Sequence, residues 1–348
     1  MSIKRILIFV VVFALANLTH AGTLDNLTQF GDLRDFETPT DFVIKVQPDY
    51  PAPHQKVTIS LDTISYTGVS DIAWVVNGNI IKSGKDIKQI EVETGNLGEK
   101  LDIHAVVKPQ DRQMFIANAV ILPSRITLLK EAETYTPQFY KGRSRYSTGA
   151  FVRLQAIPEI SRGDGTIYNP DELIYIWKRN QETMQDVSGL GRASIRIKGP
   201  GIFRKDLIIL EVKNPKGETV STIATYIEAQ DPKIILYKHR PLLGGAIFSA
   251  ITYSSILDPA LIEIVAEPYF AIISNRNDTN LKYTWFVDDK KLPTNEPISE
   301  ASFTIDGDKK SFAIKVKLQN AVLRAQSAIT KMIINTAGAE SAPNKFGL

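Results

Sequence analysis

The sequence predicts an all-β protein in which one domain type is used three times. A nine-residue layout at residues 281–289 recurs at residues 173–181 and, more loosely, at residues 70–78. These copies contain the chain's three tryptophans, each with an apolar residue two positions before it and Asn or Asp three positions after it. In the clearest copy, every second residue from Leu281 to Val287 is large and apolar, which is typical of a strand with one face on a core.

A tight turn is predicted directly after each tryptophan strand. Asn77-Gly78 is the strongest of the three signals, because both residue types tolerate positive φ in a type I′ hairpin. Asn180-Gln181 and Asp288-Asp289 stand at the same position as weaker turn pairs. Asp288 and Asp289 also resemble a carboxylate pair or calcium ligands, but their counterparts indicate that the position requires turn-forming residues.

Further short strands are expected at matching distances from each tryptophan. The segments before it are 57–61, 152–156 and 261–265, and those after it are 90–92, 195–197 and 303–305, followed by 101–107, 207–212 and 312–318. Strands spaced in this way, in units of about one hundred residues with a central tryptophan, predict three tandem immunoglobulin-like β-sandwich domains.

The repeated units resemble bacterial immunoglobulin-like or PKD-like domains, in which a tryptophan strand runs into an Asn or Asp turn. The whole chain is similar to secreted multi-domain bacterial surface proteins. The resemblance implies a fold that serves adhesion, spacing, carbohydrate binding or assembly, and it does not select among them. Because the chain has no cysteine, each sandwich depends on its core, to which Trp74, Trp177 and Trp285 are expected to contribute most.

The N-terminus has the features of a secretory signal peptide over residues 1–21. Lys4 and Arg5 precede the apolar run 6–15, and Ala21 supplies the small residue at the cleavage site. The run is shorter than the ~20 residues that span a bilayer, so we expect cleavage and no transmembrane span thereafter.

The rest of the chain divides at two short proline-containing junctions, Pro123-Ser124 and Asp231-Pro232. We expect a polar leader over 22–40, domains over 41–124, 125–231 and 232–335, and a polar tail over 336–348. Short junctions favour a semi-rigid rod over domains on flexible linkers.

We expect no catalytic site, cofactor or metal. His54, His104 and His239 are scattered, and His104 lies on the outward phase of its strand. The sequence contains no nucleophile elbow, phosphate loop or zinc-binding helix motif. Asp306-Gly307-Asp308 resembles the start of a calcium loop without its remaining ligands, and Arg162-Gly163-Asp164 is a single RGD tripeptide in a predicted turn.

The charge balance also limits the classes of partner that we expect. With 41 basic and 38 acidic residues the net charge is +3, far below that of most nucleic-acid-binding proteins, so no nucleic-acid partner is expected. The first domain is acidic and the other two are mildly basic. This asymmetry suits head-to-tail association or contact with anionic envelope polymers, and ordinary solvation explains it equally well.

The candidate interaction surface consists of apolar loops in the second and third domains. Its residues are Tyr135, Phe139, Tyr140, Leu242, Leu243, Ile247, Phe248, Tyr269 and Phe270. An exposed patch of this kind marks a protein partner or a membrane surface. Alternatively, these residues cap a sandwich or pack on the preceding domain.

The leading hypothesis is a secreted, non-catalytic cell-envelope protein that acts as a structural spacer or protein-interaction module. Its partner would be another envelope protein or a surface polymer, outside the cell or in the periplasm. The alternative is a carbohydrate-binding accessory protein of the cell surface, with Tyr135, Phe139 and Tyr140 as an exposed stacking platform.

Overall fold

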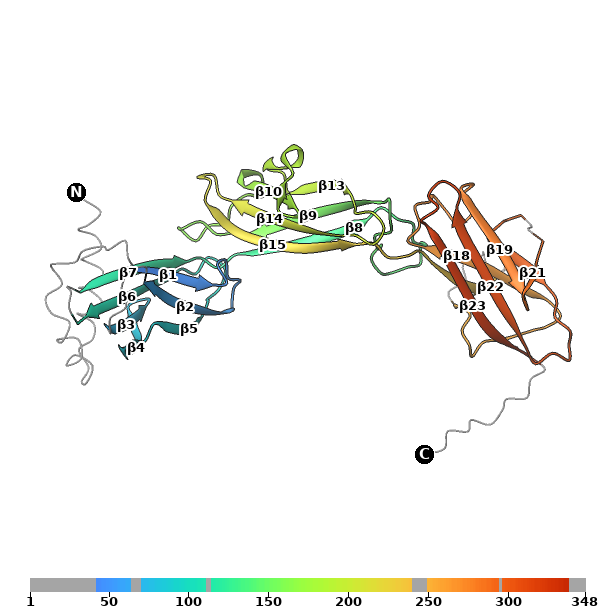
Figure 1. Cartoon of the computed structure of the whole chain (residues 1–348), viewed down its shortest axis with the longest axis horizontal. Helices are drawn as coiled ribbons and strands as arrows, with labels where there is room; N and C mark the ends of the chain where they lie inside the picture. Colours follow the sequence, from blue (N-terminus) through green and yellow to red (C-terminus); the bar gives the residue numbers. More distant parts are fainter. Residues whose placement is uncertain (1–41, 64–69, 111–113, 240–248, 294–295, 338–348) are drawn as a thin grey trace, which may run out of the picture.

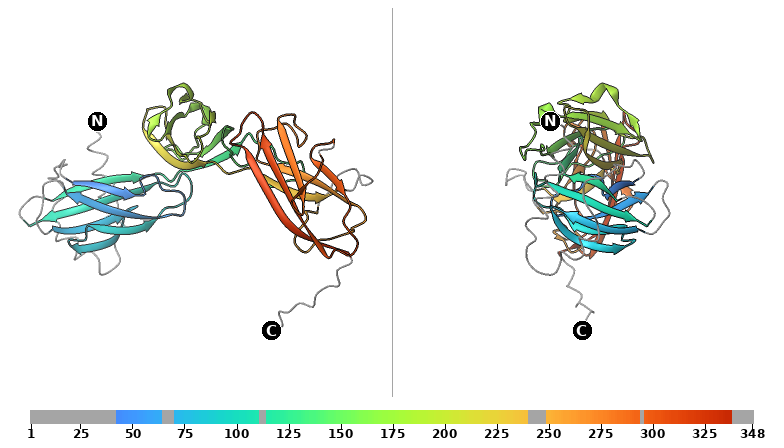
Figure 2. Two further views of the ribbon diagram at one scale, coloured as in Figure 1. Left: turned by 45° about the vertical axis from the view of Figure 1, so that its right-hand side comes forward. Right: turned by 90° about the vertical axis from the view of Figure 1, so that its left-hand side faces the viewer.

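The structure is a computed structural model that describes residues 42–63, 70–110, 114–239, 249–293 and 296–337. It is all-β, with three tandem immunoglobulin-like sandwiches that follow one another along the molecule (Figure 1). The same order is visible after a turn about the vertical axis (Figure 2). The expected signal peptide (1–21), the leader (22–40), most of the tail, and Leu242, Leu243, Ile247 and Phe248 lie outside the described residues.

No helix within those residues has the length and apolar character needed to cross a membrane.

Domain 1 packs a three-stranded sheet against a four-stranded sheet. The first sheet has the order β1 (Phe42–Gln47), β2 (Lys56–Thr63), β5 (Gln89–Glu93). The second has the order β4 (Asn79–Lys85), β3 (Ser70–Val76), β6 (Leu101–Pro109), β7 (Phe115–Ile121).

Domain 2 repeats this arrangement. Its smaller sheet has the order β13 (Ser194–Lys198), β9 (Phe151–Glu159), β8 (Arg125–Ala132). Its larger sheet has the order β11 (Glu182–Thr183), β10 (Ile174–Arg179), β14 (Lys205–Lys213), β15 (Thr219–Glu228), and β12 (Gly189–Leu190) also pairs with β10. Two 3-10 turns, Pro170–Glu172 and Gln185–Val187, flank β10.

Domain 3 has the same two layers. One sheet has the order β16 (Lys233–Lys238), β18 (Ile262–Tyr269), β21 (Glu300–Phe303). The other has the order β17 (Ile256–Leu257), β23 (Ser327–Thr336), β22 (Ser311–Asn320), β19 (Leu281–Val287), β20 (Lys290–Lys291). Only the β17–β23 pair is parallel among the pairs that the structure describes.

Each sandwich encloses a separate hydrophobic core around one tryptophan. Trp74, Trp177 and Trp285 are at most 3% exposed and belong to three different clusters of buried residues. A buried indole needs an acceptor for its single N–H. Each finds a backbone carbonyl further along its own domain: Ile87 at 2.7 Å, Arg192 at 2.8 Å and Ile298 at 3.3 Å.

The turn after each tryptophan strand has the same geometry in all three domains. Both residues of every pair have positive φ, as a type I′ hairpin requires: Asn77, Gly78, Asn180, Gln181, Asp288 and Asp289. The side chain of the first residue accepts a hydrogen bond of 2.9 Å from a backbone N–H of the neighbouring strand, at Asp102, Leu207 and Ala313. This geometry agrees with the turn interpretation of Asp288-Asp289.

Two details differ from the expected elements. We expected Tyr269 and Phe270 in an apolar loop, whereas Tyr269 ends strand β18, in which Pro268 pairs with Ile234 of β16. Proline is tolerated there because the other neighbour, β21, pairs only as far as Val265, so Pro268 lies on a free edge. At the C-terminus β23 includes Thr336, which is buried and which we had placed in the polar tail.

Replacing Trp177 with Ala should lower the free energy of unfolding of domain 2 by about 3–5 kcal/mol, because the change leaves a large cavity in the core. Chemical denaturation of the full chain, followed by hydrogen exchange in each domain, would measure this. Leu190→Ala is the control in the same domain, since Leu190 is 67% exposed and should change the value by no more than about 0.5 kcal/mol. Equal effects of the two substitutions would contradict the core assignment.

Candidate ligand site at the junction of the second and third domains

A long connection between β8 and β9 of domain 2 reaches onto domain 3. Its base is tied to its own domain, since Ser144 Oγ donates to Ala132 O (2.6 Å) and Thr134 Oγ1 donates to Arg145 O (2.9 Å). Near its tip the chain turns at Gly142, where a Cβ atom would lie 2.4 Å from the Tyr140 ring, too close for any other residue without a shift. The connection therefore presents Phe139 and Tyr140 to domain 3.

Backbone hydrogen bonds join this connection to the end of β18. The Tyr135 N–H donates to Ala271 O and the Phe270 N–H donates to Tyr135 O, both at 2.7 Å. Phe270 has a φ of +64°, so the chain leaves β18 in a left-handed conformation at this point. The two bonds set Tyr135 opposite both Phe270 and Ala271, which is the hydrogen-bond pattern of a β-bulge in an antiparallel pair.

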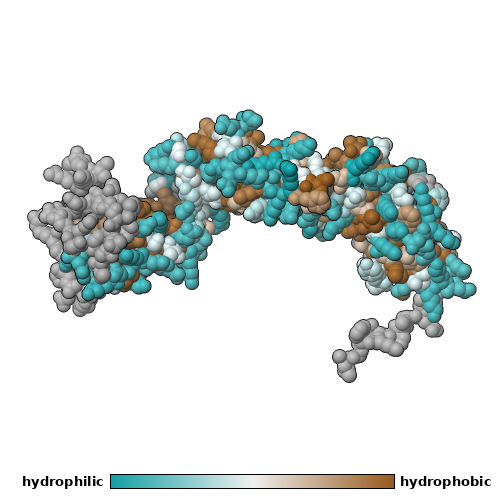
Figure 3. All heavy atoms as spheres, viewed as in Figure 1, coloured by the Kyte–Doolittle hydropathy of each residue, from teal (hydrophilic) through white to brown (hydrophobic). Residues whose placement is uncertain are grey.

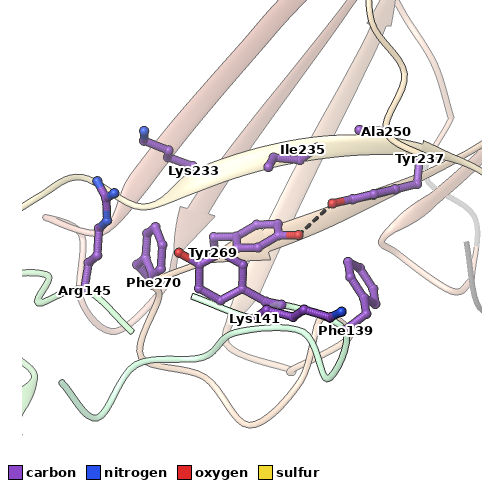
Figure 4. A pocket seen from close by; sticks show the side chains of 10 residues that line it. Phe139, Lys141, Arg145, Lys233, Ile235, Tyr237, Ala250, Tyr269 and Phe270 are labelled. Atoms are coloured by element: carbon purple, nitrogen blue, oxygen red, sulfur yellow. Dashed lines mark hydrogen bonds between the residues drawn. The ribbon is translucent and has the colours of Figure 1, made fainter. Parts of the chain in front are cut away.

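Aromatic side chains from both domains meet beside these bonds and line a pocket (Figure 4). Phe139 lies edge-on to Tyr237, and Tyr140 lies edge-on to Tyr269, each pair with ring centroids 5.4 Å apart. The hydroxyl groups of Tyr237 and Tyr269 share a hydrogen bond of 2.6 Å. The pocket has a volume of about 480 Å³ and is completed by Phe270, Ile235 and Ala250.

The polar part of the pocket lining is basic. Lys141, Arg145 and Lys233 contribute to it, and the lining residues that the structure describes include no Asp or Glu. Arg145 lies 5.7 Å from the centre of the Phe270 ring, and its Nη1 donates to Gln230 Oε1 at 2.9 Å. The combination of aromatic rings and cations suits a ligand with an apolar body and negatively charged or polar substituents.

A buried carboxyl group connects the same two domains. Glu267 on β18 is 3% exposed, and its Oε1 accepts a hydrogen bond of 2.6 Å from the Tyr135 hydroxyl. Its Oε2 lies 3.3 Å from Arg276 Nη1. Arg276 Nη2 lies 3.5 Å from Glu300 Oε1, and Glu300 Oε2 lies 3.5 Å from His239 Nδ1. Burial raises the pKa of Glu267 more than Tyr135 and Arg276 lower it, and burial together with Glu267 raises the pKa of Tyr135.

The structure brings together five of the nine residues predicted to form the interaction surface. Tyr135, Phe139, Tyr140, Tyr269 and Phe270 all lie at this junction. Tyr269 and Phe270 are each 4% exposed, and the Tyr140 ring packs against both, as the packing interpretation describes. The idea of an exposed platform fits poorly, because the Tyr135 hydroxyl is held by Glu267 and the other two rings stand edge-on to rings of domain 3.

Sequence reasoning missed the domain 3 wall and the cations of the pocket. The missed residues are Lys141, Arg145, Lys233, Ile235, Tyr237 and Ala250. One signal in the sequence could have found the domain 3 wall. Residues 234–237 of β16 are all apolar, so both faces of this strand are expected to be covered.

The other motifs singled out in the sequence are engaged locally. Arg162 of the RGD tripeptide pairs with Glu172 and lies over the Tyr168 ring, while Asp164 accepts hydrogen bonds from the backbone and hydroxyl of Thr166. Asp306 accepts hydrogen bonds within its own turn.

The remaining two histidines lie apart from the junction. His54 contacts Asn96 and His104 contacts Asn118. The part of the chain that the structure describes contains no group of three or more His, Asp or Glu able to hold a metal ion.

Comparisons with known proteins leave the family open. No protein-family model matches the chain, and no curated protein matches it. Among solved structures it is similar to the central fibronectin-III array of RIM-binding protein (12% identity, TM-score 0.31, covering 86% of this chain and 98% of that one).

Two further solved structures are similar at the same low level. For the fibronectin(III)-like modules of Clostridium thermocellum CbhA the identity is 11% and the TM-score 0.25, covering 54% of this chain and 94% of that one. For Bacteroides ovatus SGBP-B, solved with a mixed-linkage heptasaccharide, the identity is 9% and the TM-score 0.24, covering 87% of this chain and 68% of that one. No functional inference rests on similarities this weak.

The raised pKa of Glu267 predicts that the stability of the junction depends on pH. A group whose pKa is higher in the folded than in the unfolded state contributes full stability below its ordinary pKa and loses it as the pH rises through the folded value. We therefore expect wild-type domain 3 to lose stability as the pH rises above the ordinary Glu value of about 4.3. Thermal unfolding between about pH 4 and about pH 8 would measure this window.

Glu267→Gln should flatten the pH profile across that window, because Gln cannot titrate but can still accept the Tyr135 hydrogen bond. Glu131→Gln is the matched control, since Glu131 is an exposed carboxyl outside the junction. A profile that keeps its slope in Glu267→Gln would contradict the role assigned to Glu267.

Proposed function

We propose that this chain is an exported, non-catalytic protein of the cell envelope that acts as a semi-rigid spacer and interaction module. The signal-like N-terminus supports export, and the row of three sandwiches supports a spacer (Figure 1). The observation that carries the proposal is that a buried polar residue forms bridging hydrogen bonds at each junction, Ser124 at the first and Gln326 at the second. Such bridges restrict the angle between neighbouring domains, which default to relative motion when they share only a linker.

At the second junction, Gln326 of domain 3 is 1% exposed and inserts its side chain between the domains. Its Nε2 donates to Ser147 Oγ (2.8 Å) and Thr148 O (3.0 Å) of domain 2, while its Oε1 accepts from the Ile272 N–H (2.8 Å). A buried amide with all of these partners is costly to pull apart, because separation leaves donors and acceptors to be solvated again. The Tyr140 ring adds apolar packing across the same junction, against Tyr269 and Phe270.

At the first junction, Ser124 lies in the link between β7 and β8 and forms hydrogen bonds with both domains. Its N–H donates to Pro51 O of domain 1 at 3.0 Å, and its Oγ donates to Val220 O of domain 2 at 3.1 Å. Gly98 of domain 1 lies against a loop of domain 2, since a Cβ there would be 3.2 Å from Gly165 O and from Ser161 Oγ. The two domains therefore touch closely through a pair of loops as well as through the link.

Removing the Gln326 bridge should loosen the second junction. In Gln326→Ala combined with Tyr140→Ala, small-angle X-ray scattering should show a wider distribution of maximum dimensions than in the wild type. Each cross-domain hydrogen bond lost should weaken docking by about 1 kcal/mol. Gln319→Ala, an exposed glutamine on β22, should leave the scattering curve unchanged. A wild-type curve that already requires a broad ensemble of domain orientations would refute the spacer proposal.

The pocket favours a second candidate function, a carbohydrate-binding accessory protein. Its rings offer apolar contact for sugar faces, and its three cations and tyrosine hydroxyls offer polar partners. Under this proposal the ligand lies between the domains and contacts residues of both, so that binding also stabilises their docking.

Phe139→Ala should reduce sugar affinity about fivefold, the equivalent of about 1 kcal/mol for one aromatic contact. Isothermal titration with a panel of neutral and uronate-containing oligosaccharides would measure this. Phe203→Ala removes a fully exposed ring in domain 2 and serves as the matched control. Equal affinity in Phe139→Ala and the wild type would place sugar binding elsewhere.

A further inference from the structure

The outer face of the larger sheet of domain 3 carries lysines without interspersed acids. Strands β19, β20, β22 and β23 contain no Asp or Glu. On the face that points away from the core they carry five lysines: Lys282, Lys291, Lys315, Lys317 and Lys331. We call this set the lysine face.

Three of the five lysines lie in one row across neighbouring strands. Lys315 of β22 pairs with Lys331 of β23 on one side and with Phe286 of β19 on the other, and Phe286 pairs with Lys291 of β20. Residues directly opposite in an antiparallel pair have Cβ atoms about 5 Å apart, and like charges at that distance are unfavourable. Folding stability alone does not explain such a row.

Among the described residues, one carboxyl pairs with a lysine of this face. Asp289, in the turn after β19, pairs with Lys315 at 2.6 Å. The ammonium groups of Lys315 and Lys317 lie 4.6 Å and 5.6 Å from the centre of the Phe286 ring, so the ring holds two cations together. Lys282, Lys317 and Lys331 are exposed to solvent.

The equivalent positions in the other two sandwiches are different. The three domains can be aligned on the residue that pairs with each tryptophan, namely Ala105, Leu210 and Val316. On this alignment, the positions of Lys315, Lys317 and Lys331 are occupied in domain 1 by His104, Val106 and Asn118. In domain 2 they are occupied by Ile209, Glu211 and Ala224. In domain 2 Glu211 even neutralises Lys178 on the same face through an ion pair. The lysine face is therefore not a requirement of the fold and is confined to domain 3.

Apolar residues stand between the lysines. Ile329 and Ile333 on β23 are 65% and 58% exposed and alternate with Lys331. Figure 3 shows hydrophilic and hydrophobic atoms interleaved over domain 3. A partner must therefore combine regularly spaced negative charge with apolar surface between the charges.

We infer that the lysine face binds an anionic polysaccharide with carboxylate groups along its chain. Sugar rings present apolar C–H faces between their charged substituents, which matches Ile329 and Ile333 between the lysines. The repeated charge of such a polymer matches a row of cations that spans four neighbouring strands. The lysine face is on the opposite sheet of domain 3 from the aromatic pocket, so this inference goes beyond the proposed function.

Other partners fit the lysine face less well. Protein interfaces are depleted in lysine and enriched in arginine, and the four strands contain no Arg. Single-stranded nucleic acids stack on exposed aromatic rings, whereas the one ring here, Phe286, is covered by two ammonium groups. A membrane surface requires apolar side chains that insert beyond the charges, but Ile329 and Ile333 are shorter than the lysines beside them.

The test uses the full chain without its first 21 residues and, as the probe, polygalacturonate at low ionic strength. Lys317→Gln combined with Lys331→Gln should weaken binding roughly tenfold and flatten its salt dependence. Lys198→Gln combined with Lys216→Gln removes the same charge from exposed positions of domain 2 and should leave the affinity within about twofold. The Lys317 and Lys331 variant should melt no lower than the wild type, since it relieves repulsion between like charges.

Several results would overturn the inference. One is absence of polygalacturonate binding at low salt, and another is an equal loss of affinity in the two lysine variants. A loss in Phe139→Ala without a loss in the Lys317 and Lys331 variant would place the polymer in the pocket instead. Tighter binding to phosphatidylglycerol vesicles or to DNA than to polygalacturonate would replace the polysaccharide by that partner.

Discussion

The buried tryptophan is the feature on which each sandwich depends. Its indole fills the centre of a core that has no disulfide, and its N–H must find an acceptor where water is excluded. In all three domains that acceptor is a carbonyl in the segment that leads from the tryptophan strand back to the smaller sheet. The hydrogen bond therefore fixes the path of the chain between the two sheets as well as the ring itself.

The turn after the tryptophan completes this constraint from the other side. Asn77, Asn180 and Asp288 each bond through both backbone and side chain to the facing strand of the same sheet. Core and turn together leave the outer faces and the connecting loops free to vary. Two outer surfaces of domain 3 differ from the shared pattern in this way. One is the lysine face, and the other is the outer face of β16 and β18, which contacts domain 2.

The junction between domains 2 and 3 combines apolar packing with groups that are costly to bury. Glu267, Tyr135 and Gln326 are held by hydrogen bonds from or to the other domain. Buried polar groups of this kind restrict the relative orientation of two domains more than they strengthen docking. Each group must meet its partner in one geometry or remain without a hydrogen bond. The aromatic rings beside them supply the apolar area. Under the spacer proposal, this division would let a short link hold the two domains in a defined arrangement.

The sequence by itself determined the all-β class, the threefold repeat, the tryptophan at each centre and the turn that follows it, because these depend on local alternation and on residues with special backbone freedom. It also pointed to Tyr135, Phe139 and Tyr140 as unusual, but not to their contacts. Only the tertiary structure decided that Tyr269 ends a strand, that Tyr237 and Lys233 line the same pocket, and that five lysines share one face. Those facts depend on which strands pair and in which register, and segments far apart in the chain contain no local signal of that pairing.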